Sequence, residues 1–253
     1  SYQQPAVSGL RTNTLKLSIQ DWPAIAPYPL APVPWCPSGF VIRQPAPTGQ
    51  PASLPPGKHP YHAAGLYYLQ DPSAMAAAEL LAPRPGERIL DLSAAPGGKT
   101  THLAALIHNQ GLLVANEIHP QRAWDLAQNL ERCGVRNATI LNENPARLAA
   151  HFGAFFDRVL LDAPCSGEGM FRKSPTARHE WKPGLVQSCA LRQAEILTSA
   201  AQMVRPGGFL AYITCTFAPQ ENESILDAFL TANPQFELVD LPLPTGLAPA
   251  RPD

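Results

Sequence analysis

Short apolar runs alternate with amphipathic stretches along most of the chain from residue 88 onward. Apolar runs bounded by turn residues are typical of buried strands, whereas apolar residues that recur every three or four positions are typical of helices. The runs predict strands over 88–92, 112–118, 138–141, 157–164, 208–216 and 236–241. The amphipathic stretches predict helices over 99–106, 121–133, 185–204 and 221–232. Strands that alternate with helices predict an α/β fold with a doubly wound, mostly parallel, Rossmann-like sheet.

The first third of the chain has a different pattern. Residues 10–18 alternate polar and apolar side chains and residues 39–43 form a second apolar run, which together predict two strands. Prolines crowd the residues between and after these strands, and proline cannot donate within a helix or a central strand. A helix is expected over 73–81, between Pro72 and Pro83. We therefore expect a small auxiliary domain over residues 1–66 and a larger domain over 67–253.

A glycine turn joins the first strand of the larger domain to its first helix. Gly97 and Gly98 let the backbone approach a ligand, and the free N–H groups of the helix that begins at Lys99 would face it. The spacing matches neither the dinucleotide fingerprint nor the P-loop, so the turn alone leaves an ordinary strand-to-helix connection equally open. Glu117 ends the next strand about 20 residues later, where a carboxylate suits the two hydroxyls of a ribose.

Polar residues and cysteines follow the other predicted strands. In a parallel sheet the carboxyl ends of the strands meet at one edge, which is where ligands bind. The candidates at this edge are 93–99, Glu117, Asn144, 162–165 and 214–216. Their agreement on one edge is the strongest structural argument that the sequence offers for a binding site.

Composition narrows the class of protein. The net charge is −1 and the sequence pI is about 6.6, so the strongly basic footprint of many nucleic-acid binders is missing. Basic residues do gather after the first cysteine motif, at Arg172, Lys173, Arg178, His179 and Lys182. The five cysteines lack the spacing of a disulfide framework or a zinc site, and no apolar run could cross a bilayer. We expect a reduced, cytoplasmic setting, no metal and no membrane association.

Several motifs resemble a known family. They are 94–100 (AAPGGKT), 162–167 (DAPCSG) and 214–216 (TCT), with further similarity over 67–75 and 217–224. The chain resembles the S-adenosylmethionine-dependent RNA cytosine-C5 methyltransferases of the RsmF/Sun type, from about Arg11 to about Leu230. The resemblance implies that residues 1–66 are a small α/β, RNA-binding-like domain. It also implies additional sequence before the chain and one more strand after it, so both domains are expected to be incomplete.

The resemblance implies a covalent mechanism. Cys215 would attack cytosine C6, Cys165 would assist product release and Asp162 would contact N3. A Pro-Cys cysteine is the nucleophile in DNA cytosine methyltransferases, so Cys165 is the competing candidate. The residues expected to hold S-adenosylmethionine are Ser93, Ala94, Ala95, Pro96, Gly97, Gly98, Lys99, Glu117, Asn144 and Asp162. Lys173 and Arg172 are expected to touch RNA, and Lys99 has either the cofactor carboxylate or an RNA phosphate as its partner.

The expected reaction is methyl transfer to a cytosine in RNA, most of all ribosomal RNA, by a monomeric enzyme that releases S-adenosylhomocysteine. Transfer RNA is the alternative substrate. A non-catalytic fragment that binds RNA or the cofactor is a second hypothesis, and a DNA or small-molecule methyltransferase that uses Cys165 is a third. The RNA class rests on the resemblance and not on any single residue.

Overall fold

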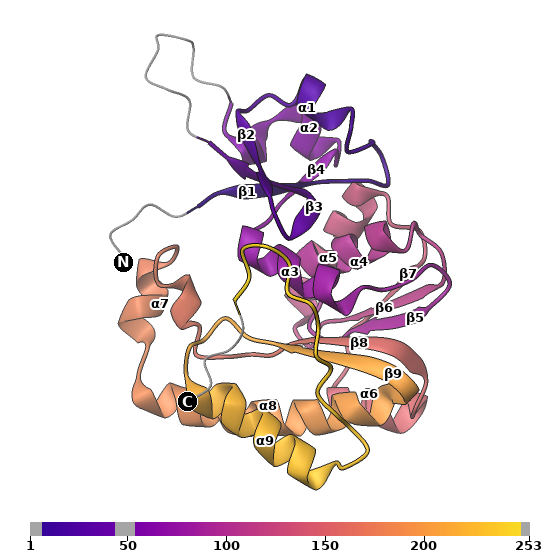
Figure 1. Cartoon of the computed structure of the whole chain (residues 1–253), viewed down its shortest axis with the longest axis vertical. Helices are drawn as coiled ribbons and strands as arrows, with labels where there is room; N and C mark the ends of the chain where they lie inside the picture. The colour runs from indigo at the N-terminus through magenta and orange to yellow at the C-terminus, as the bar shows by residue number, and fades with distance from the viewer. Residues whose placement is uncertain (1–6, 44–53, 249–253) are drawn as a thin grey trace.

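The structure is a computed structural model that describes residues 7–43 and 54–248. Its larger sheet has the strand order β7-β6-β5-β8-β9, and every neighbouring pair is parallel (Figure 1). The strands are β5 (Arg88–Asp91), β6 (Leu112–Asn116), β7 (Ala138–Leu141), β8 (Phe156–Asp162) and β9 (Val204–Ile213). The predicted α/β class is therefore confirmed, because chain order reverses beside β5 as in a doubly wound sheet.

Helices cover both faces of this sheet. They are α3 (Pro72–Leu81), α4 (Gly98–Leu106), α5 (Pro120–Cys133), α6 (Pro145–Phe152), α8 (Pro183–Met203) and α9 (Glu223–Ala232). On one face, Ile89 and Leu160 of the sheet pack against Leu103 of α4 and against α3. On the other face, Leu90 and Val159 pack against α6, α8 and α9. Alternate strand residues thus enter two separate cores, which is why the strands read as continuous apolar runs.

A smaller antiparallel sheet precedes this unit (Figure 1). Its order is β2-β3-β1-β4, formed by β2 (Leu30–Val33), β3 (Cys36–Ile42), β1 (Gly9–Thr12) and β4 (Tyr67–Leu69). Short helices α1 (Trp22–Ile25) and α2 (Pro60–Ala63) and a 3₁₀ turn at Pro56–Lys58 accompany it. Trp22 and Tyr67 are fully buried in its core with their rings 5.4 Å apart. Pro32 is tolerated because β2 lies at the edge of this sheet.

Arg11 fastens the small sheet to the larger unit. Its side chain is 1% exposed, and its Nε donates to Gln70 Oε1 at 3.0 Å. A terminal guanidinium nitrogen donates to Thr101 Oγ1 of α4 at 2.8 Å. Asn13 adds a second tie, because its Nδ2 donates to the carbonyl of Cys133 at 2.8 Å. The charge of Arg11 is therefore used inside the protein and not at an RNA-facing surface.

Two strand predictions are wrong. The strand expected over 10–18 ends at Thr12, because Asn13 begins a turn in which its carbonyl accepts from the N–H of Lys16 at 3.0 Å. The strand expected over 236–241 does not form. Phe236 instead packs edge to face on Phe229 of α9 with ring centroids 5.3 Å apart, and the described residues that follow it pair with no strand of the sheet. Leu238 is then 72% exposed, and an apolar alternation without a neighbouring strand leaves the backbone unpaired.

Other elements were not predicted. Helix α6 begins at a proline in a stretch too short for a clear period, and β2 lies among prolines. Helix α7 (Pro175–Glu180) follows the first cysteine motif. Strand β9 starts and ends earlier than the predicted 208–216, so Cys215 lies in the loop after the strand and not within it.

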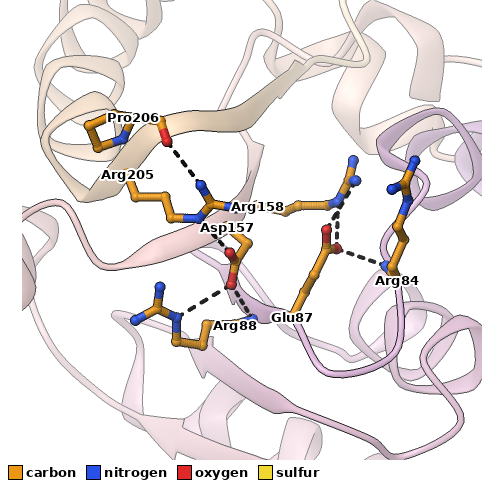
Figure 2. Close-up of polar contacts among 7 residues, drawn as sticks. All are labelled: Arg84, Glu87, Arg88, Asp157, Arg158, Arg205 and Pro206. Carbon is orange, nitrogen blue, oxygen red and sulfur yellow. Dashed lines mark hydrogen bonds and ion pairs between the residues drawn. The ribbon is translucent and has the colours of Figure 1, made fainter.

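An ionic network holds the amino-terminal ends of the central strands together (Figure 2). Asp157 at the start of β8 accepts from the backbone N–H of Arg88 at 2.7 Å and from Arg205 Nε at 2.5 Å. Arg158, 7% exposed, pairs with Glu87 at 2.6 Å. Buried charges are tolerated when they are paired in this way. The network lies opposite the carboxyl ends, so it orders the strands without occupying the candidate site.

No helix within residues 7–43 and 54–248 combines the length and apolar character needed to cross a lipid bilayer.

Candidate active site

The glycine turn after β5 is a preformed cradle. Gly97 has φ 108°, and a Cβ there would lie 3.3 Å from Leu126. Helix α4 begins immediately afterwards without a side-chain cap, so its first N–H groups face the turn. The carbonyl of Pro96 accepts from Tyr68 Oη at 3.2 Å and from Asn129 Nδ2 at 2.8 Å. The small sheet, through Tyr68, and the larger unit, through Asn129, thereby both fix the position of the turn.

Asp91, which the sequence reasoning missed, lies beneath this turn. It is fully buried at the end of β5, and its Oδ2 accepts from Thr100 Oγ1 at 2.7 Å. Burial raises the pKa of its carboxyl group to about 6, against the opposing effect of the Thr100 hydrogen bond. Its Oδ1 has no hydrogen-bond partner among the described residues. An acidic residue at the carboxyl end of an apolar strand was the signal that could have identified it.

Glu117 occupies the position expected for a ribose ligand. It follows β6 directly and is 2% exposed. One carboxylate oxygen accepts from the backbone N–H of His119 at 3.0 Å, and the other lies 3.2 Å from Arg122. Arg122 also donates to the carbonyl of Ala95 at 2.8 Å. Arg122 therefore connects the Glu117 carboxylate to the glycine turn.

Asn144 lies at the same edge of the sheet but already has a structural partner. It is the N-cap of α6, and its Oδ1 accepts from the N–H of Ala146 at 2.8 Å. Because the carbonyl oxygen serves as a cap, the amide NH₂ group is the part of the side chain left for a ligand. The role of Asn144 in cofactor binding stays a prediction.

Lys99 and Asp162 join the turn to strand β8. Lys99 Nζ donates to Asp162 Oδ2 at 2.6 Å, and both side chains remain partly exposed. Asp162 ends β8, three residues before Cys165. The ion pair therefore stands between the cradle and the cysteines.

The two cysteines of the sequence motifs meet at the ends of β8 and β9. Their Sγ atoms lie 3.2 Å apart, and the backbone N–H of Cys215 donates to Cys165 Sγ at 3.3 Å. Cys215 is exposed, whereas Cys165 is partly buried. Hydrogen bonding from Cys215 lowers the pKa of Cys165 to about 7. The same contact raises the pKa of Cys215, to which the charge of Asp162 contributes. The pair therefore favours a thiolate on Cys165 with the proton kept on Cys215.

A buried glutamate, also missed from sequence, holds the two cysteine loops in register. Glu221 is 0% exposed and accepts from the backbone N–H of Ser166 at 2.9 Å and from Gln193 Nε2 at 3.0 Å. Ser166 Oγ also contacts the same carboxylate and lies 2.9 Å from Thr216 Oγ1. Ser166 follows Cys165 and Thr216 follows Cys215, so this carboxylate fixes both cysteines through their neighbours. Its place in the segment 217–224 was the only available signal.

The two residues expected to touch RNA lie in the loop that follows the first cysteine motif. Lys173 forms an ion pair with Asp71, the N-cap of α3, and Arg172 is exposed. The Lys173 ion pair ties this loop to the helix that leads out of the small sheet. Their contacts with RNA stay predictions.

One possible metal cluster lies away from this edge. Cys36, Glu79 and His102 offer ligand atoms within 4.8 Å of one another, the one such group in residues 7–43 and 54–248. Glu79 Oε1 is 3.0 Å from His102 Nε2, and burial lowers the pKa of His102 to about 4. The positive charge of the buried Arg11 acts on Glu79 and His102. The cluster lies where β3 of the small sheet meets α3 and α4, away from the edge that carries the cysteines.

The comparisons with known proteins agree with this geometry. Residues 78–250 match the family model for 16S rRNA methyltransferase RsmB/F, and residues 1–72 match the N-terminal domain of 16S rRNA methyltransferase RsmF. The fold is that of a Rossmann-like methyltransferase. The chain belongs to the RsmB/F family of 16S rRNA methyltransferases, as the resemblance in its sequence predicted.

Individual relatives give the extent of the match. Ribosomal RNA small subunit methyltransferase F of Vibrio vulnificus is 42% identical over 228 residues, which cover 88% of this chain and 47% of the relative. The crystal structure of PH0851 is similar over 98% of this chain and 54% of its own, with 31% identity and a TM-score of 0.86. A methyltransferase homolog from Pyrococcus horikoshii is similar over 92% of this chain and 72% of its own, with 32% identity and a TM-score of 0.77. The chain thus spans about half the length of the curated relative.

Proposed function

We propose that the chain binds S-adenosylmethionine at the glycine turn and transfers its methyl group to C5 of a cytosine in RNA, with ribosomal RNA as the substrate. The observation that carries the proposal is the contact of Cys165 and Cys215 at 3.2 Å, beside the ion pair of Lys99 and Asp162. Two thiols at the ends of adjacent strands, next to a cofactor cradle, suit covalent catalysis on a pyrimidine.

The residues at the cradle fit this cofactor. Gly97 gives the turn its left-handed backbone, with φ 108°, close against α5, and the uncapped start of α4 offers N–H groups beside it. The Glu117 carboxylate suits the ribose hydroxyls, and the unpartnered Oδ1 of Asp91 offers an acceptor below the turn. When bound, S-adenosylmethionine supplies an electrophilic methyl group. Among the other predicted ligands, residues 93–99 would line the cradle and Asn144 would lie near the adenine.

Cys215 is the proposed nucleophile, and Cys165 is the proposed store for its proton. As the sulfur of Cys215 bonds to cytosine C6, its proton passes to the Cys165 thiolate, and electron density moves to C5. After C5 accepts the methyl group, its proton leaves to solvent. The electron pair of that C–H bond re-forms the C5–C6 double bond as the bond between C6 and sulfur breaks, and the released Cys215 thiolate takes its proton back from Cys165. The lowered pKa of Cys165, to about 7, supports this exchange.

Asp162 is the proposed contact to cytosine N3. Its Oδ2 accepts a hydrogen bond from Lys99 Nζ at 2.6 Å, and the carboxyl group shares an opening with Cys215. The base must leave its stack to reach this opening, so single-stranded or flipped RNA is the required form of substrate. Arg172 and Lys173 are the proposed phosphate contacts next to the site. We further propose that the small sheet is an auxiliary RNA-contacting unit, that its boundary with the catalytic unit, expected near residue 66, falls just after β4, which pairs with β1, and that the monomeric protein acts in the cytoplasm.

The test is methyl transfer from labelled S-adenosylmethionine to ribosomal RNA, followed by nucleoside analysis. We expect label in 5-methylcytidine with the wild-type chain and none with Cys215→Ala. Cys189→Ser is the matched control, because Cys189 is buried in α8. Label in another nucleoside, or 5-methylcytidine formed by Cys215→Ala, would contradict the proposal. Cofactor binding without transfer to ribosomal RNA or transfer RNA would identify a binding module instead.

A further inference from the structure

A cavity of about 610 Å³ lies beside the cysteine pair, and the first turns of α8 form part of its wall. Its walls include three aromatic side chains, Phe171, Trp181 and Phe217, and its polar lining includes Gln187, Gln220 and Glu168. The cavity is open to solvent, so a ligand could reach it without movement of the fold.

The cavity wall is rigidly linked to the proposed nucleophile. Phe217 stands two residues after Cys215, a separation that the chain can span in about 7 Å. The backbone N–H of Gly169 donates to the carbonyl of Cys215 at 2.7 Å. Glu168 accepts from the backbone N–H of Phe217 at 2.8 Å and from Thr216 Oγ1 at 2.9 Å. The aromatic wall and the reacting sulfur therefore belong to one hydrogen-bonded unit.

The lining identifies the kind of occupant. Phe217 is an aromatic residue with 73% of its surface exposed, although exposure of a large apolar ring to water is unfavourable. Phe171 and Trp181 contact each other edge to face at 6.4 Å. The carboxylate of Glu168 would repel a phosphate, whereas aromatic faces and amide groups suit a planar, uncharged ring with polar edges. A nucleobase has these properties.

We propose that this cavity receives a nucleobase adjacent to the target cytosine in the RNA, stacked on Phe217. The inference rests on the proposed function, which brings the target base to Cys215. When the target base leaves its stack, its neighbour loses a stacking partner, and the ring of Phe217 replaces it. Gln187 and Gln220, which line the cavity, carry amide groups that can hydrogen-bond to the edge of that base. The cavity would thus contribute to the choice of sequence around the modified cytosine.

The test compares short single-stranded RNAs that contain one cytosine. One RNA is intact, and two others carry an abasic nucleotide immediately before or after the cytosine. Dissociation constants are measured by fluorescence anisotropy for the wild-type chain, for Phe217→Ala and for Trp124→Ala. Trp124 is the control because it is an aromatic residue that is 65% exposed on α5 and lines no part of the cavity.

Stacking on an aromatic side chain predicts that one abasic position weakens wild-type binding by about 5- to 150-fold. Phe217→Ala should bind the intact RNA as weakly as the wild type binds that abasic RNA, and it should show no further loss with the abasic RNA. Trp124→Ala should behave as the wild type. Equal losses from the abasic nucleotide in wild type and Phe217→Ala would overturn the inference, because the two changes would then act independently.

Two further readouts separate the inference from the function on which it rests. Cofactor binding by Phe217→Ala shows that the variant is folded, and Trp181→Phe keeps an aromatic ring as a milder change. If the wild type forms 5-methylcytidine but the losses are independent, the inference fails and the function stands. If the abasic pattern appears without any 5-methylcytidine, the reaction fails and the cavity remains a base-binding site. Absence of RNA binding would overturn both.

Discussion

Cys165 Sγ lies 3.2 Å from Cys215 Sγ, although 50 residues separate the two cysteines in sequence. The contact exists because parallel strands β8 and β9 are neighbours and end at the same edge of the sheet. At this distance the two thiols share a proton, and the Cys215 backbone N–H stabilises the thiolate of Cys165. The cysteines therefore act as one chemical unit, and four predictions concern this unit and its surroundings.

The first prediction concerns pH. The pKa of Cys165 lies near 7, below that of an ordinary thiol. The Cys165 thiolate therefore forms as pH rises through about 7 and is lost below it. The single-turnover rate of RNA methylation should rise through this range and then level off. In Cys165→Ala the inflection should move to a higher pH, because Cys215 loses its proton acceptor. An unchanged inflection in the variant would show that another group controls the rate.

The second prediction concerns oxidation. Hydrogen peroxide should convert the Cys165 thiolate to a sulfenic acid, and the Cys215 sulfur should then displace hydroxide to form a disulfide. Methylation activity should fall and return after treatment with dithiothreitol. Mass spectrometry of peptides should find the link between residues 165 and 215. Loss of activity that dithiothreitol does not reverse, with no such link, would contradict the proximity of the two sulfurs.

The third prediction concerns Glu221. Glu221→Gln places an amide where the carboxylate accepts from Ser166 and Gln193, leaving a buried donor without a partner. We expect a loss of about 1–3 kcal/mol in the free energy of unfolding. We also expect slower methyl transfer with little change in cofactor affinity, because the carboxylate positions the cysteine loops and not the cradle. Glu223→Gln, an exposed change in α9, is the control for thermal melting and rate. Wild-type rates in Glu221→Gln would remove this positioning role.

The fourth prediction concerns the cofactor. Glu117→Ala should weaken binding of S-adenosylmethionine by roughly 10- to 150-fold, the equivalent of a lost hydrogen bond to a charged group. Isothermal titration calorimetry measures the affinity directly. Glu131→Ala changes an exposed glutamate on α5 and should leave the affinity as in the wild type. Equal affinities for the Glu117 variant and the wild type would place the ribose elsewhere.

The sequence predicted those parts of the fold that depend on local pattern. Strands such as Arg88–Asp91 are buried on both faces and therefore appear as apolar runs, and the carboxyl-end rule brought Lys99, Asp162 and both cysteines to one edge. The division of the chain at residue 66 and the roles of the individual site residues stay predictions.

The parts that could not be predicted depend on contacts between distant residues. Asp91 is an acidic residue at the end of an apolar strand, and its burial against Thr100 is the feature that the sequence does not show. The burial of Arg11 against Thr101 of α4 depends on how the small sheet docks on the larger unit. The alternation over 236–241 is a strand pattern, but Phe236 packs on α9 and the described residues after it have no neighbouring strand. In each case the outcome depended on which residues of the folded chain surround the side chain. A short stretch of sequence does not contain that information.

The most direct test of the central claim is a denaturing gel of the protein after incubation with methyl-labelled S-adenosylmethionine and ribosomal RNA. We expect a covalent band of protein with RNA in Cys165→Ala, where the bond from Cys215 to C6 forms but is slow to break. We expect no band in Cys215→Ala or in the double variant. A band that persists in Cys215→Ala and disappears in Cys165→Ala would reverse the two roles and contradict the account.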